Sequence, residues 1–227
     1  MPRQVKPTAN GVIAEIADLL ALLRRHQDGI FLYRGEDAAS YPLRPKLGRQ
    51  VPKEFDWSDI EETLIDAFKR RGAPYLTSRP HSELQWLTLA QHHGLATRLL
   101  DWTQNPLVAL FFAVATADAT SDCVLYALRT DEMLYVDDSE SPFALGKVVL
   151  HEPSHVSPRV TAQRGVFSIH PDPTVAYKSK FLERWVVKRE SVVQLLVDVE
   201  TLGITYEAMF PGLDSVARQA NADSLGI

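Results

Sequence analysis

Residues 91–106, QHHGLATRLLDWTQNP, contain the most informative pattern in the chain. Two imidazoles, a guanidinium, a carboxylate and an indole fall within this stretch, and an apolar run, residues 107–117, follows at once. A solvated loop has no need of that apolar flank, and a core segment has no use for so many polar groups. The pattern therefore predicts a polar site held on a buried scaffold.

The same stretch predicts how the surrounding chain folds. A helix with apolar residues on one face is expected over residues 82–93, and Gly94 ends it. Residues 97–102 are typical of a short strand or turn. Asn105 and Pro106 then supply an N-cap and a proline at the first helical position, so an apolar helix is expected to follow.

Helical and strand patterns divide the chain into two unlike halves. Before residue 91, the expected elements are a helix over 13–28, a short strand over 30–34, a proline-containing loop over 42–52 and a helix that a capping box opens at Ser58–Glu61. After residue 118, the expected elements are strands at 123–128, 147–150, 165–170 and 185–188, and helices at 190–202 and 213–220. Helices that dominate one half and strands the other predict the α+β class in a single domain.

Length and composition agree with that class. At 227 residues, with 45% hydrophobic and 23% charged residues, the chain has the make-up of one large globular domain or of one domain with an extension. We expect a helix or extension over residues 1–28, with residues 1–10 frayed, and the main domain over residues 29–227. The single cysteine, Cys123, excludes an internal disulfide and is expected to be a buried thiol, which fits a reducing compartment.

No secretory or membrane segment is expected. The N-terminal residues lack an apolar run, and residues 107–117 are about half as long as the ~20 residues that span a bilayer. A cytoplasmic location is therefore expected. The net charge of −5 argues against a general nucleic-acid binder, because such proteins normally present a basic field, although a local basic groove stays open.

Several common catalytic motifs are absent or interrupted. Residues 151–155, HEPSH, match the letters of the zinc-protease pattern, but Pro153 opposes the helix that would place both imidazoles on one face, so a loop between strands is expected. The chain has neither a glycine-rich phosphate-binding loop nor a G-x-S-x-G elbow. The adjacent His92 and His93 would point about 100° apart on a helix, one inward and one to solvent. No metal is expected.

Arg34 is a candidate site residue because of its surroundings. It ends an apolar strand beside Gly35, and a glycine lets another group approach the backbone closely. A guanidinium in that place can fork onto a phosphate or a carboxylate of a ligand. The alternative is an internal ion pair with an acid such as Asp101, Glu36 or Asp37.

Asp101 and Trp102 are open to two interpretations each. Asp101 can act in catalysis, or it can hold Arg34 or Arg98 in place or orient a histidine. Trp102 can offer a stacking face for a base or a nicotinamide ring, or it can fill the core.

Four segments, in order, resemble the FRG domain family. Residues 31–35, FLYRG, resemble the segment from which the family takes its name, and residues 91–106 closely match its longest block, with Ala96 where a proline is common. Residues 159–167 and 209–214, the latter MFPGLD, resemble its third block and its usual ending. The resemblance spans roughly residues 30–218.

The order of these segments is also similar to that of the ADP-ribosyltransferase superfamily. The resemblance implies a helical N-terminal half packed on a mostly antiparallel sheet, which in that superfamily can be split. It also implies an early strand ending in Arg or His that grips NAD, a Ser or Thr before a helix, and a later Glu or Gln. Arg34, Thr103 and Gln163 match those positions. Since Gln163 is not an acid, the acid must come from elsewhere, with Asp101 as the first choice.

The same resemblance implies roles for individual residues, with NAD as substrate. Arg34 would bind the pyrophosphate, an acid would stabilise the oxocarbenium-like sugar, and His93 or His92 would act as general base. Tyr33 or Trp102 would stack on the nicotinamide. The expected catalytic residues are Arg34, His93, Asp101 and Gln163. The expected NAD-binding residues are Tyr33, Arg34, Gly35, His92, Arg98, Trp102, Thr103 and Asn105.

Three functions stay open at this point. The preferred one is an NAD-consuming enzyme that transfers ADP-ribose to a macromolecule or hydrolyses NAD, as a bacterial or phage toxin or a phage-defence effector would. The second is a non-catalytic module that binds a nucleotide or a peptide. The third is a nuclease or phosphodiesterase using His92 or His93, Arg98 and Asp101, which the acidic net charge counts against. The single-site hypothesis expects Arg34, Asp101, His93 and Gln163 to line one pocket.

Overall fold

The computed structural model describes residues 9–117, 120–153 and 158–225. The strands in these ranges are β1 (Gly11–Ile13), β2 (Phe31–Glu36), β3 (Leu99–Thr103), β4 (Cys123–Arg129), β5 (Tyr135–Val136), β6 (Val149–His151), β7 (Gly165–Ile169) and β8 (Leu182–Val187). The α-helices are α1 (Ile16–Arg25), α2 (Lys46–Gln50), α3 (Trp57–Gly72), α4 (Glu83–His92), α5 (Pro106–Val114), α6 (Pro158–Gln163), α7 (Val192–Thr201), α8 (Tyr206–Met209) and α9 (Leu213–Leu225). Two 3-10 turns, Ala73–Tyr75 and Arg189–Ser191, complete the elements.

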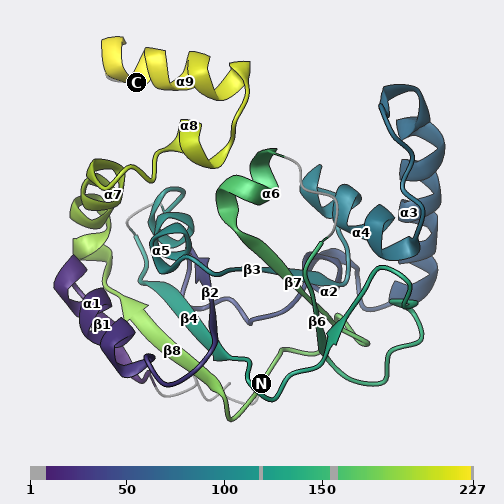
Figure 1. Cartoon of the computed structure of the whole chain (residues 1–227), viewed down its shortest axis with the longest axis horizontal. Helices are drawn as coiled ribbons and strands as arrows, with labels where there is room; N and C mark the ends of the chain where they lie inside the picture. Colours follow the sequence, from purple (N-terminus) through teal and green to yellow (C-terminus); the bar gives the residue numbers. More distant parts are fainter. Residues whose placement is uncertain (1–8, 118–119, 154–157, 226–227) are drawn as a thin grey trace.

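The eight strands form one mixed sheet in the order β1-β8-β4-β2-β3-β7-β6-β5 (Figure 1). Neighbouring strands are antiparallel except at the two edges, where β1 runs parallel to β8 and β5 parallel to β6. The predicted α+β class and the mostly antiparallel sheet are therefore confirmed.

The sheet has its fewest paired residues at its centre, between β2 and β3. Strand β2 pairs with β4 along its whole length, Phe31 to Glu36, but it pairs with β3 at a single position, Tyr33 opposite Thr103. Beyond that pair the two strands diverge. The sheet thus consists of two four-stranded halves, β1-β8-β4-β2 and β3-β7-β6-β5, which meet at one backbone junction.

Helix α5 lies directly on β2 because Gly35 has no side chain. A Cβ at this position would lie 2.0 Å from the backbone oxygen of Ala109 and 2.5 Å from the backbone nitrogen of Ala113. The close approach predicted for Gly35 is confirmed, and the approaching group is the α5 backbone. Together with α1 and α7, α5 forms the main apolar core against this half of the sheet, with Leu22 and Leu195 fully buried (Figure 1).

The second half of the sheet is covered by α3 and α4. Ile65 of α3 and Leu84 and Leu87 of α4 pack in one cluster with Leu99 of β3 and Ile169 of β7. Figure 1 shows α5 and α7 beside one half and α3 and α4 beside the other. Each half therefore has its own helical cover, and the central divergence lies between the two covers.

The short elements and the N-terminal region differ from the sequence-based predictions. Ile13, expected in a helix, lies in β1, whose parallel pairing with β8 joins the N-terminal residues to the sheet. The stretch 42–52, expected to be a loop, contains α2, which is too short to show a helical period. Of the expected frayed segment, residues 1–8 lie outside the described residues.

The predicted capping box at Ser58–Glu61 is wrong. Asp56 is the N-cap of α3, and its side chain accepts a hydrogen bond from the Ser58 backbone nitrogen at 2.8 Å. Glu61 is buried and pairs with Arg98, so it is not available to cap the helix.

The remaining predictions on local structure have mixed outcomes. Cys123 is buried in β4 and belongs to no disulfide, as expected. In the HEPSH segment, His151 ends strand β6, while residues 154 and 155 lie outside the described residues. Within the described ranges, no helix is both long and apolar enough to cross a membrane.

We expect Gly35→Ala to destabilise the fold strongly. The new Cβ meets α5 backbone atoms, which cannot rotate away, so the free energy of unfolding should fall by about 3 kcal/mol or more. Gly72→Ala is the matched control, because Gly72 has helical dihedral angles and a Cβ added there would have no atom within 4 Å. That change should stabilise by about 0.5–1 kcal/mol. Urea denaturation measures the free energy of unfolding of both variants. Equal changes in the two variants would contradict the packing argument.

Candidate functional site

A pocket of about 350 Å³ opens where β2 and β3 diverge. Its volume lies within the roughly 300–1,000 Å³ typical of ligand sites. Residues of β2, β3, α2, α4, α5 and α6 line it, so it draws on both halves of the sheet. The charged side chains in the lining are Arg34, Glu36, Asp37, Lys46, Arg49 and Asp101.

Arg34 spans the divergence between the two strands. Its Nε and Nη2 donate hydrogen bonds to Glu36 Oε1 at 2.9 and 2.7 Å. Its Nη1 donates to the backbone oxygen of Asp101 at 2.7 Å and lies 3.5 Å from the Asp101 carboxylate. Burial alone would lower the pKa of Arg34, but the nearby carboxylates of Glu36 and Asp101 raise it by more. The pKa therefore lies above its ordinary value, and the guanidinium stays charged. These contacts are the internal ion pair that the sequence left open.

Asp101 presents the accessible carboxylate of the pocket. Its side chain is 57% exposed, whereas that of Glu36 is 8% exposed. Gln91 Nε2 donates to Asp101 Oδ2 at 2.8 Å, and Gln91 Oε1 accepts a hydrogen bond from Thr97 Oγ1 at 2.6 Å. Because Thr97 determines which way the amide points, and Arg34 holds the backbone, Asp101 is oriented from two sides while it faces solvent.

Helix α2 adds two cations that sequence reasoning missed. Arg49 Nη1 lies 3.4 Å from Glu36 Oε2, and Lys46 Nζ donates to the backbone oxygen of Gly94 at 2.7 Å. A Cβ at Gly48 would lie 1.8 Å from the Pro173 backbone oxygen, so α2 is closely docked. Among the described residues, the Arg49 side chain makes that single hydrogen bond, which leaves most of its guanidinium for an anion.

Little in the sequence indicated that Glu36, Gln91, Lys46 and Arg49 belong to the site. Glu36 follows Arg34 at the strand period of two, and the sequence had suggested it as an ion-pair partner only. Gln91 lay in the diagnostic stretch without an assigned role. Nothing in the local sequence linked Lys46 and Arg49 to the pocket, because only the docking of α2 brings them there.

The two adjacent histidines have different surroundings. His92 lines the pocket and is half-buried, while His93 is exposed and its ring lies 6.3 Å from that of Phe68 on α3. The expectation that His93 lines the pocket with Arg34 is therefore wrong; as the C-cap of α4 it points to the α3 side. Within the described part of the chain, no group of three or more His, Cys, Asp or Glu residues could hold a metal ion.

Arg98 does not reach the pocket, contrary to the expectation that it binds the ligand. Its Nε and Nη2 donate to Glu61 Oε2 at 2.8 and 2.5 Å, and its Nη1 donates to the Pro142 backbone oxygen at 3.1 Å. The guanidinium also lies over the rings of Trp57 and Phe143, at 5.3 and 4.8 Å from their centroids. Arg98 and Glu61 are both almost fully buried, so this pair belongs to the core.

Tyr33 and Trp102 line the pocket but are core residues by burial. Tyr33 is 5% and Trp102 2% exposed, so neither offers an open ring face for stacking. The Tyr33 hydroxyl lies 3.2 Å from His26 Nδ1, on the side of α1. Of the two interpretations of Trp102, core filling is the one that the structure supports.

Thr103, Asn105 and Gln163 connect the elements around the pocket. Thr103 Oγ1 donates to the Gln163 backbone oxygen at 2.6 Å and accepts from the Asn105 backbone nitrogen at 3.0 Å. Asn105 Oδ1 caps α5, as predicted, by accepting from the Leu107 nitrogen. Gln163 lines the pocket, and its Nε2 donates to the Met209 backbone oxygen at 2.9 Å. Of the four residues expected to meet, Arg34, Asp101 and Gln163 share the pocket.

A buried hydrogen-bond chain lies behind the pocket wall. Trp102 Nε1 donates to Ser168 Oγ at 2.8 Å, and Ser168 Oγ lies 2.9 Å from His170 Nε2. Ser168 Oγ accepts from the indole, and it pairs with His170 Nε2 either as donor or as acceptor a second time, depending on the tautomer of the imidazole. Burial, together with the charge of Arg34, lowers the pKa of His170 to about 4.

One of the comparisons with known proteins gives a match. Residues 29–122 match the family model described as the FRG domain, which covers the FLYRG segment and the whole of residues 91–106. The resemblance to this family is confirmed over that range; the segments at 159–167 and 209–214 lie beyond it. No curated protein and no solved structure matches the chain.

Breaking the buried Arg98–Glu61 pair should cost far more than removing a surface charge. Glu61→Gln leaves the Arg98 guanidinium buried without a counter-charge, so we expect the free energy of unfolding to fall by about 3–5 kcal/mol. Glu62→Gln, at an exposed position one residue along α3, should change it by less than about 0.5 kcal/mol. Urea denaturation measures the free energy of unfolding of both variants. A similar small loss of stability in the two variants would refute a structural role for Arg98.

His170 should make stability depend on pH. Its pKa is about 4 in the folded chain and 6.5 in the reference state, so between these values the unfolded chain takes up a proton that the folded chain does not. Stability should therefore fall by up to about 3 kcal/mol as the pH drops from 6.5 to 4. Urea titrations at several pH values should show a flatter profile for His170→Asn and an unchanged one for His81→Asn, an exposed histidine. Identical profiles in all three proteins would exclude this role of His170.

Proposed function

We propose that the pocket binds NAD as a substrate and cleaves the bond between nicotinamide and ribose, passing ADP-ribose to water or to an acceptor. The observation that carries the proposal is the accessible Asp101 carboxylate, oriented by Arg34 and Gln91 in a pocket that also holds the cations Lys46 and Arg49. A substrate that develops positive charge at a sugar and carries a pyrophosphate matches this combination of charges.

Asp101 is assigned to the sugar. As the C1′–N bond breaks, its electron pair moves to the positively charged nicotinamide nitrogen, and the ribose becomes oxocarbenium-like. A carboxylate beside the sugar stabilises that charge, as carboxylates do in glycoside cleavage. Glu36 suits this role less, because it is buried and shared between Arg34 and Arg49.

The pyrophosphate is assigned to Lys46 and Arg49 rather than to Arg34. Most N–H groups of Arg34 are directed at Glu36 and Asp101, whereas Arg49 keeps unused donors. Arginine binds phosphate in a two-pronged geometry that a fixed helix such as α2 can present. Arg34 is then a positioning residue that holds Asp101 across the strand divergence.

His92 is the candidate general base. It lines the pocket, so it can take the proton of the water or acceptor hydroxyl that attacks C1′. With water as the nucleophile, the products are ADP-ribose, nicotinamide and one proton. With an acceptor, the new bond joins ADP-ribose to that group, and a toxin or phage-defence role in a bacterial host would follow from the acceptor's identity.

The likeness to ADP-ribosyltransferases is part of the proposal and expects a divided sheet with the site at the division. Two four-stranded halves meet at one backbone pair, and the pocket lies at that junction. Arg34, Thr103 and Gln163, which match the three positions of the superfamily's plan, all line it. The nuclease alternative has less support, because Arg98 is enclosed in the core with Glu61.

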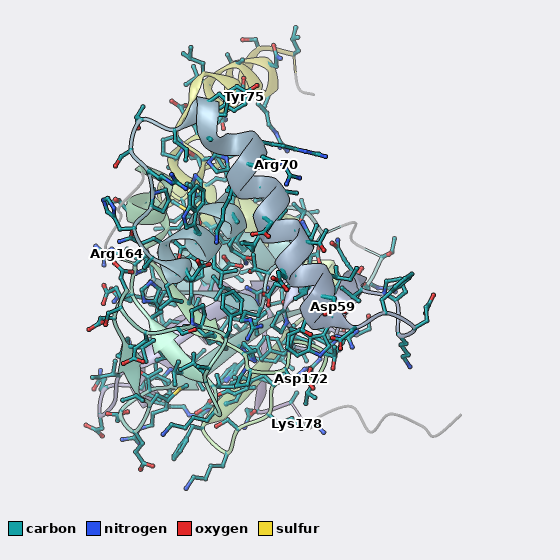
Figure 2. The ribbon with its side chains drawn as sticks, turned by 90° about the vertical axis from the view of Figure 1, so that its right-hand side faces the viewer. Asp59, Arg70, Tyr75, Arg164, Asp172 and Lys178 are labelled. Carbon is teal, nitrogen blue, oxygen red and sulfur yellow. The ribbon has the colours of Figure 1, made fainter. Side chains whose placement is uncertain are left out.

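NAD turnover tests the proposal directly. Nicotinamide release, followed by chromatography, should occur with the wild-type chain and fall by at least about 100-fold in kcat for Asp101→Asn. Arg49→Gln should mainly raise KM, because it removes a ground-state contact to the pyrophosphate. Asp59→Asn is the control for the charge change: Asp59 is exposed at the start of α3, far along the helix from Arg70 (Figure 2), and does not line the pocket.

Each alternative predicts a different result. A thermal shift with NAD or ADP-ribose but no nicotinamide release would replace the enzyme with a binding module. Cleavage of labelled RNA or DNA that His92→Ala abolishes would favour a nuclease. Full turnover by Asp101→Asn would remove Asp101 from the chemistry.

A further inference from the structure

A second hollow lies at the C-terminal end of α3. Its volume is about 580 Å³, and it has no residue in common with the pocket between β2 and β3. The lining combines cations, hydroxyls and one indole: Lys69, Arg70, Thr77, Ser78, Arg79 and Trp86. Asp66, one turn earlier on α3, is the acid of the lining.

The chain around this hollow is strongly basic for so acidic a protein. Residues 67–82 contain Lys69, Arg70, Arg71 and Arg79 and no aspartate or glutamate, while the whole chain has a net charge of −5. We call this segment the α3 tip. It provides a local excess of cations that the overall composition hides: the hollow is flanked by two acids, Asp66 in its lining and Glu83 bound to Lys69, and the arginines outnumber them.

Several hydrogen-bond donors at the α3 tip have no partner within the described ranges. Lys69 is bound by Glu83, with Nζ 2.8 and 2.9 Å from the two carboxylate oxygens. In contrast, the guanidinium of Arg79 and the hydroxyls of Thr77 and Ser78 make no hydrogen bond or ion pair with the residues described. The same holds for Arg70. Guanidinium and hydroxyl groups that line one hollow and have no acceptor among the residues described match the oxygens of a phosphate.

An exposed aromatic ring lies in the same segment, between Arg70 and Arg79 in the chain and outside the lining of the hollow. Tyr75, in the 3-10 turn that follows α3, is 87% exposed. Figure 2 shows Tyr75 and Arg70 at the same end of the helix. Trp86 is 6% exposed and lies under Lys69, so it forms the floor of the hollow, whereas Tyr75 can present a ring face to a ligand. A nucleobase stacks on such a ring regardless of sequence.

We propose that the α3 tip binds single-stranded nucleic acid, with Arg70 and Arg79 on phosphates and Tyr75 stacked on a base. Single-stranded binding sites combine a basic groove with exposed aromatic rings in this way. A duplex keeps its bases stacked inside and would leave Tyr75 without a partner. A phosphopeptide would use the arginines but has no need of the ring. The proposal is independent of the chemistry assigned to the other pocket.

Fluorescence anisotropy with a labelled single-stranded RNA or DNA of mixed sequence tests the proposal on the full chain. At low salt the wild-type protein should bind, and the double variant Arg70→Gln, Arg79→Gln should lose at least about tenfold in affinity. The loss of two phosphate contacts should also reduce the slope of log K against log salt by about 1.4. Tyr75→Ala should weaken binding roughly tenfold and leave the salt slope unchanged.

The matched control is Lys178→Gln with Lys180→Gln. This pair removes the same charge from exposed positions, and Lys178 lies at the opposite end of the molecule from Arg70 (Figure 2). An equal loss of affinity in the control would mean non-specific attraction and would overturn the proposal. Three other results would also overturn the proposal. They are no binding at low salt, binding of a duplex that is equally tight and is unaffected by Tyr75→Ala, and binding of a phosphopeptide but not of the oligonucleotide.

Discussion

The single backbone pair between β2 and β3 is the constraint around which the molecule is arranged. Strands that diverge leave polar backbone groups without a ladder partner, and such groups must find other partners when buried. Arg34 meets that need by donating to the Asp101 backbone oxygen. On the other side, Gly35 admits α5 onto β2. The pocket exists because the two halves of the sheet meet at this junction and separate beyond it.

Two arginines of the chain show how surroundings decide the role of one residue type. Arg98 and Glu61 form a buried pair whose guanidinium also contacts two aromatic rings, so no ligand can reach either charge. Arg34 has a buried partner, Glu36, and an exposed one, Asp101. The first pair can contribute only to the core. The second holds a carboxylate at a pocket wall, where a ligand can meet it.

Local signals predicted the longer elements because their physical cause is local. Asn105 and Pro106 start α5 by capping and by a preset backbone angle, and both act within one turn. Glu61 shows the opposite case: three residues after Ser58 it suggests a cap, yet burying the Arg98 charge requires it in the core. Helix α2 was missed for a similar reason, since contacts with the segments around Thr97 and Pro173 hold its five residues in place.

The sequence alone determined the α+β class, the strand that carries Arg34 and the importance of residues 91–106, because periodicity, caps and polar density are properties of neighbours in the chain. The tertiary structure decided which polar groups face a ligand. It separated His92 from His93, enclosed Arg98, and brought Arg49 of α2 to the carboxylate of Glu36. Those outcomes depend on how strands diverge and helices dock, and burial of each charge is settled by residues far away in sequence.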